Sequence, residues 1–166
     1  MTMKKLLITA MLAAVCGGVE AQVVNPDSII DGNKYAKTEE WPEDGHLPQF
    51  RNGTEDLFRW LSFYVRYPKE AKKHKVEGRV IITFVVEGDG SISNVEPVQS
   101  LVHFVNKEKA LKATGMTEEE MTNHFGNLFQ DEARRVLNSM PNWKPGVQFG
   151  RPVRVKYTIP ITFAQP

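Results

Sequence analysis

Residue types that could carry out catalysis are scattered along the sequence. The spacing of the histidines is not that of a metal site or of a general base beside an acid. These residues are His46, His74, His103 and His124. Ser91 and Ser93 lie in an alternating pattern, without the strand-to-helix turn that exposes a catalytic serine. The run Glu87-Gly88-Asp89-Gly90 lacks the repeated ligands and the closing glutamate of a calcium loop. We therefore expect no enzyme activity, no metal ion and no cofactor, and we expect a binding module.

Three consecutive glutamates, at positions 118 to 120, have a structural explanation. Thr117 and Glu120 have the spacing of a capping box, and carboxylates are favourable in the first turn of a helix. Apolar residues follow at helical spacing, which predicts a helix over Thr117–Phe125. From Asp131 to Met140 the chain is predicted to continue as the main helix, with apolar residues on its buried side, and Pro141 ends it.

Alternation predicts two strands in the middle of the chain. In the range Gly78–Glu87, one face is fully apolar and the other is mixed. The apolar face holds Val80, Ile82, Phe84 and Val86, and the mixed face holds Arg79, Ile81, Thr83 and Val85. Gly88 and Gly90 surround Asp89, a combination typical of a tight turn. We expect a hairpin that leads into a second strand, Ser91–Val98.

The last part of the chain has the cleanest alternation. It predicts a strand over Arg151–Phe163, with a turn at 148–150 before it. Pro160 has no backbone N–H for a ladder hydrogen bond, so this strand should lie at an edge of the sheet for at least part of its length.

A helix is predicted before the first strand. Asn52 and Glu55 have the spacing of a capping box. An apolar stripe follows at helical spacing, formed by Leu57, Phe58, Leu61, Tyr64 and Val65, with Trp60 and Phe63 beside it. We expect all of these side chains to pack in the core.

Several short motifs recur in one order. They are Tyr67-Pro68, Ala71 in a short basic helix, Val76-Glu77-Gly78-Arg79-Val80, Asp89-Gly90 and Trp143-Lys144-Pro145-Gly146. In this order they resemble the TonB C-terminal domain, over about residues 47–163. The resemblance implies an α+β fold, with a three-stranded antiparallel sheet and helices packed on one face. The family has no segment like 101–129, which reads here as an inserted helical segment.

The resemblance also implies a function. Members of the family recognise an extended peptide, the TonB box of an outer-membrane transporter, which adds as a strand to the exposed sheet edge. The corresponding side chains are Arg66, Tyr67, Pro68, Arg154, Lys156 and Thr158. Phe149 stands where relatives usually have a polar residue, which makes it a candidate contact. Inner-membrane motor proteins and a second copy of this chain remain further candidate partners. The alternative is a structural or regulatory envelope protein without energy coupling.

The start of the chain resembles a secretory signal. Residues 1–21 contain a positive segment at Lys4 and Lys5, an apolar stretch and a small-residue cleavage site before Gln22. The apolar stretch is shorter than the roughly 20 residues of a spanning helix, so a membrane anchor is the less favoured interpretation. Lipid attachment at Cys16 is ranked below ordinary cleavage, because Val15 stands where lipoproteins have a small residue. We expect a periplasmic protein.

The expected domains are the signal 1–21, an irregular arm 22–46 and the TonB-like domain 47–166. The energy-transducing relatives have a membrane helix and a long proline-rich spacer, and neither is expected here. Without residues 1–21 the chain has 19 basic and 19 acidic side chains. Nucleic acid is therefore not an expected partner, because its binding requires a basic surface.

Overall fold

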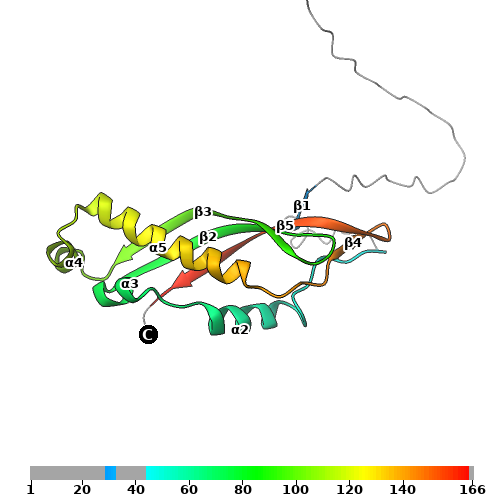
Figure 1. Ribbon diagram of the computed structural model, residues 1–166, viewed down its shortest axis with the longest axis horizontal. Helices are drawn as coiled ribbons and strands as arrows, with labels where there is room; N and C mark the ends of the chain where they lie inside the picture. Colours follow the sequence, from blue (N-terminus) through cyan, green and yellow to red (C-terminus); the bar gives the residue numbers. More distant parts are fainter. Residues whose placement is uncertain (1–28, 33–43, 165–166) are drawn as a thin grey trace, which may run out of the picture.

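The computed structural model describes residues 29–32 and 44–164. The expected signal 1–21 and most of the expected arm 22–46 lie outside these residues. The described elements are β1 (Ile29–Asp31), α2 (Thr54–Tyr64), α3 (Lys69–His74), β2 (Val76–Val86), β3 (Ile92–Phe104), α4 (Lys107–Thr114), α5 (Glu118–Asn138), β4 (Gly146–Gln148) and β5 (Arg151–Phe163). The fold is α+β, as expected. Figure 1 shows an elongated sheet with α3 and α4 near one end and β4 near the other.

The sheet contains the three predicted strands and two that were not predicted. Its order is β1-β5-β2-β3, and β4 pairs with the start of β5. β2 pairs antiparallel with both β3 and β5, whereas β1 pairs parallel with β5. The strand expected to end at Val98 continues to Phe104, which is opposite Val76 in the β2–β3 register. The three-strand prediction is therefore right for the centre of the sheet and incomplete at its outer side.

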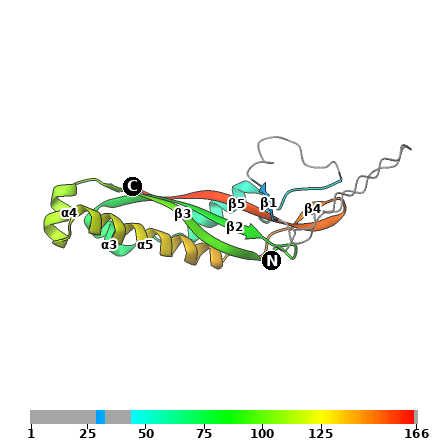
Figure 2. The ribbon, with the colours of Figure 1, turned by 90° about the horizontal axis from the view of Figure 1, so that it is seen from above.

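One face of the sheet forms the core. The predicted apolar face of β2 is fully buried, and β5 adds Val155, Ile161 and Phe163 to the buried set. Helices α2, α3 and α5 contribute buried side chains to the same cluster. Figure 2, a view from above, shows that α5 runs along the sheet. On the opposite face Thr83 and Val85 are also buried, so the mixed face is less exposed than its composition suggests.

The inserted region and the main helix differ from the prediction. Thr117 and Glu120 form the predicted capping box, but α5 then continues without a break to Asn138. The two predicted helices are therefore one helix, and α4 precedes it. Gly126 lies in the middle of α5, where a Cβ would be 3.2 Å from Ser100 Oγ on β3. Close packing of the helix on β3 outweighs the weak helix propensity of glycine at this position.

Helix α2 begins one residue later than the sequence suggests, and it buries fewer of its apolar side chains than expected. Its N-cap is Gly53 without a side-chain cap, and Asn52 Nδ2 donates instead to Asp56 Oδ2, so the predicted Asn52–Glu55 capping box is wrong. The buried side chains of α2 are Leu57, Trp60 and Leu61. Three aromatic side chains expected in the core are exposed, and these are Phe58 (60%), Phe63 (81%) and Tyr64 (45%). Trp60, which was also expected in the core, is buried, so the core prediction for α2 is right for Leu57, Trp60 and Leu61 and wrong for the three exposed aromatic residues.

Among the helices in residues 29–32 and 44–164, none combines the length and the apolar character that a crossing of the bilayer would need.

Candidate functional site

The pairing of β5 changes along its length. Its first residues, Arg151–Val153, pair with β4, and the next three, Arg154–Lys156, pair with β1. From Tyr157 to Phe163 the strand pairs with β2 on its inner side, and no other described strand pairs with its outer side. Pro160 lies in this last section, as the prediction of an edge position requires.

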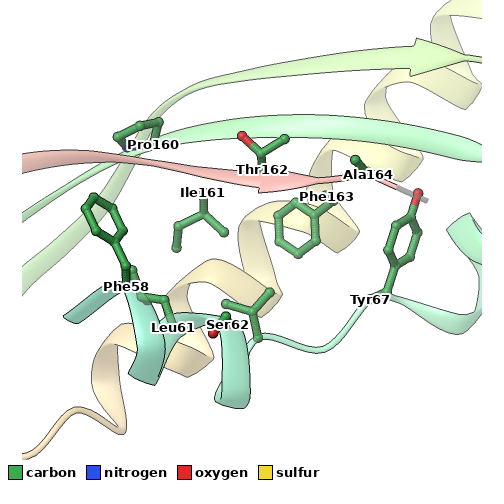
Figure 3. Close-up of a pocket in the computed structure, with 10 residues that line it drawn as sticks. Phe58, Leu61, Ser62, Tyr67, Pro160, Ile161, Thr162, Phe163 and Ala164 are labelled. Carbon is green, nitrogen blue, oxygen red and sulfur yellow. The ribbon is translucent and has the colours of Figure 1, made fainter. Parts of the chain in front are cut away.

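A groove runs between α2 and the last residues of β5. Its volume is about 410 Å³, and one wall comes from Phe58, Leu61, Ser62, Val65 and Tyr67, while the other comes from residues 160–164. Figure 3 shows Ile161 and Phe163 pointing toward α2, with Phe58 near Pro160 and Tyr67 near Ala164. The groove therefore lies directly beside the last residues of β5, whose outer side pairs with no other described strand.

A second groove continues from the first toward the middle of β5. It has a volume of about 350 Å³ and shares Phe58, Leu61 and Pro160 with the first groove. Tyr157, Ile159 and Trp143 line its inner part. Together the two grooves accompany β5 from Tyr157 to Ala164.

The sequence analysis missed this apolar wall. Phe58 was assigned to the core, although it is 60% exposed and lines both grooves. An exposed aromatic side chain beside an unpaired strand is a feature of contact surfaces rather than of cores. The hydrophobic stripe of α2 could not reveal it, because a stripe does not show which of its members faces the partner element.

Arg154, one of the predicted contact residues, is held by an ion pair. Its guanidinium donates to Glu87 at the end of β2, with Nε 2.6 Å from Oε2 and Nη2 3.0 Å from Oε1. Ser93 Oγ donates to the same carboxylate. The hydrogen bonds from Arg154 are the largest cause of a lowered pKa of Glu87, and they outweigh the opposing effect of burial. Arg154 thus connects β5 to the β2–β3 turn.

This ion pair should make stability depend on pH. Because the pKa of Glu87 is lowered by folding, its contribution is complete above the ordinary value of 4.5 and disappears as the pH falls through the folded-state pKa. A double-mutant cycle with Glu87→Gln and Arg154→Met should give a coupling of about 1 kcal/mol at pH 7, since both side chains are partly exposed. We expect urea unfolding to give a smaller coupling at pH 3 than at pH 7. An equal coupling at both pH values would contradict the assignment.

The residues around the Tyr-Pro motif have structural contacts. Tyr67 Oη donates to the carbonyl of Val76 at 2.6 Å, and its ring packs edge-on against Phe129 and Phe163. The backbone N–H of Arg66 donates to Glu132 Oε1 at 2.6 Å, and its side chain is exposed. Pro68 is the N-cap of α3. Of these three residues, only Tyr67 lines the groove beside β5.

The six predicted site residues do not form one cluster. Lys156 is exposed and Thr158 is half-buried, and both follow Arg154 along the face of β5 opposite the core. Tyr67 lies at the other end of the strand, beside Phe163. Thr158 and Phe163 are five positions apart along the strand, a distance of about 16 Å. The structure therefore distributes them along one strand edge, where an extended ligand could reach both ends.

The hairpin between β4 and β5 presents Phe149. Both loop residues have positive φ, 49° at Phe149 and 69° at Gly150, which is the pattern of a type I′ turn. The Phe149 side chain is 38% exposed. A bulky residue in this conformation is strained, and Phe149 remains a candidate contact.

No catalytic or metal-binding arrangement accompanies the edge. Within the part of the chain that the structure describes, there is no group of three His, Cys, Asp or Glu side chains placed to hold a metal ion. Burial raises the pKa of Tyr157 to about 12, and its hydroxyl donates to the carbonyl of Pro48 at 3.3 Å. Tyr157 is therefore neutral at physiological pH and serves as packing and as a hydrogen-bond donor.

Comparison with known proteins agrees with the resemblance noted in the sequence. Residues 64–114 match a family model described as "Gram-negative bacterial TonB protein C-terminal". Two NMR solution structures of the Helicobacter pylori TonB-CTD are similar to the chain. The longer has 18% sequence identity and a TM-score of 0.43, with 68% of this chain and 79% of that chain covered. The shorter has 21% identity and a TM-score of 0.37, with 66% and 90% covered. No curated protein sequence matches.

The described elements form a mixed α+β fold. The matched segment contains α3, β2, β3 and α4, together with the Tyr-Pro and Asp-Gly motifs. Over residues 64–114 the resemblance to the TonB C-terminal domain family is confirmed.

Proposed function

We propose that the protein is a periplasmic TonB-like binding module, which recognises the TonB box of an outer-membrane TonB-dependent transporter by strand addition to the outer edge of β5. One observation carries this proposal: β1 is itself a short strand added to that edge, in parallel, at Arg154–Lys156. The edge thus has backbone geometry that accepts a strand. Main-chain pairing would supply affinity, and neighbouring side chains would supply specificity.

The remainder of the edge supports the same proposal. The outer side of Tyr157–Phe163 lies beside two apolar grooves, which offer places for alternate side chains of an added strand. Phe58, which is 60% exposed, lines both grooves. Exposed Lys156 places a positive charge on the opposite face of β5, which favours an acidic residue in the ligand.

The alternative function is an envelope structural or regulatory protein, which docks through the same surfaces without energy coupling. The two functions differ in their ligand. Binding of a transporter-derived peptide supports the first, and its absence from a folded protein favours the second.

Proline at Lys156 tests strand addition. Backbone N–H groups alternate sides along a strand, so the N–H of Lys156 shares the direction of the Pro160 nitrogen, away from β2. Lys156→Pro should weaken binding of a transporter-derived TonB-box peptide at least about fivefold, because one ladder hydrogen bond is lost. Isothermal titration calorimetry measures this loss.

Lys156→Ala is the matched control. It removes the charge and keeps the ladder, so its effect on the dissociation constant should be smaller than that of Lys156→Pro. Circular dichroism confirms beforehand that each variant is folded. If folded Lys156→Pro binds as tightly as the parent, strand addition at this edge is wrong.

A further inference from the structure

The chain places its own segment on the edge that the proposed partner would use. Ile29, Ile30 and Asp31 pair with Arg154, Val155 and Lys156 in parallel register. Two of these three positions on β5 belong to the predicted contact set. An incoming strand and β1 therefore cannot pair with this section of β5 together.

The residue after β1 explains why this segment fits. Gly32 is buried, and a Cβ there would be 2.6 Å from Val155 Cγ1 and 2.9 Å from Tyr157 Cζ. Its φ lies outside the left-handed range, so the backbone alone does not require glycine. The requirement comes from the two side chains that it meets.

Neither side chain can easily move aside. Val155 is fully buried in the core. The Tyr157 ring is 5.9 Å from Phe84 and 5.7 Å from Trp143, between ring centroids, and its hydroxyl donates to Pro48. We call the surface formed by the Val155 and Tyr157 side chains the glycine contact. This surface therefore excludes any residue larger than glycine at the position that Gly32 occupies after the parallel strand.

The other positions of β1 also suit the edge. Ile30 is half-buried opposite Val155. Asp31 lies opposite Lys156, so opposite charges face each other across the two strands. The favoured pattern is an apolar residue, an acidic residue and a glycine.

β1 is short enough to be exchanged. It has three residues and pairs only with β5, whereas β2 and β5 pair over nine positions. Only a few hydrogen bonds are therefore available to offset the conformational entropy that the segment loses when it becomes ordered. The free energy gained from these hydrogen bonds and the entropic cost are similar in size.

We propose that Ile29–Gly32 is the resident ligand of the β5 edge, held by the glycine contact, and that an incoming strand binds only where it displaces this segment. The partner class is an extended segment that runs parallel to β5, with an apolar residue, an acidic residue and then glycine. This inference rests on the proposed function for the identity of the natural partner, but not for the site itself.

The test uses the full chain and a synthetic peptide of residues 26–35 of this sequence. Gly32→Val should displace the resident segment, so backbone amide exchange at Lys156 should become faster while exchange in Val80–Val86 stays slow. The peptide should then bind the Gly32→Val chain at least about tenfold more tightly than the parent, because an occupied site lowers the apparent affinity. A peptide with valine in place of the glycine is the matched control and should not bind.

Each outcome decides the inference. Unchanged exchange at Lys156 in Gly32→Val, or equal peptide affinity for parent and variant, overturns the resident-ligand proposal. Equal binding of the glycine and valine peptides overturns the glycine contact. A transporter-derived TonB-box peptide is titrated in parallel. If it binds neither form while the 26–35 peptide binds the variant, the proposed function fails and the resident-ligand site stands.

Discussion

Replacing Gly90 by alanine is expected to lower the free energy of unfolding by about 3 to 5 kcal/mol. Gly90 has φ of 84°, and a Cβ there would be only 2.1 Å from the carbonyl oxygen of Trp143. The backbone N–H of Trp143 also donates a hydrogen bond of 2.8 Å to the carbonyl oxygen of Gly90, which holds the β2–β3 turn against Trp143. Because the atom that the Cβ would meet is a backbone carbonyl oxygen, it cannot move aside cheaply, and the β2–β3 turn must shift.

Gly115→Ala is the control for Gly90→Ala. Gly115 also has positive φ, 69°, but a Cβ there would meet nothing within 4 Å. Its replacement should cost only the strain of the left-handed conformation, about 1 to 2 kcal/mol. Urea unfolding followed by circular dichroism measures both variants. Equal losses would show that the contact between Gly90 and Trp143 relaxes and does not constrain the turn.

Phe84→Ala should have the second large effect, a loss of about 3 to 5 kcal/mol. The Phe84 side chain is fully buried, and its ring contacts those of Trp143 and Tyr157 at centroid distances of 5.6 and 5.9 Å. The cavity left by the ring would remove support from Tyr157, which forms half of the glycine contact. Thermal and urea unfolding of the parent and the variant measure the loss.

Thr83→Ala is the neighbouring control on the opposite face. Thr83 is 7% exposed, and its hydroxyl donates to the carbonyl of Glu96 at 3.2 Å. Removing this single hydrogen bond should cost about 1 kcal/mol. If the two substitutions cause similar losses, the assignment of the core face to Phe84 is wrong.

Local sequence patterns were sufficient to predict the centre of the sheet and its core face. The alternation in β2 and β5 places apolar side chains on one side with a period of two, and a shift by one residue would expose them all. The Thr117–Glu120 capping box is equally local, because both its hydrogen bonds join residues three positions apart. Pro160 indicated an edge strand, because its nitrogen carries no hydrogen and cannot donate a ladder hydrogen bond in any fold.

Only the tertiary structure decided the features that depend on distant residues. Gly126 does not break α5, because packing on β3 stabilises the helix there. The apolar stripe of α2 could not show that Trp60 is buried and Phe58 is exposed, because that depends on where β5 lies. The placement of Ile29–Gly32 on β5 joins residues more than 120 positions apart. Its determinants, the Val155 and Tyr157 side chains that exclude a Cβ, come together only after the core has packed.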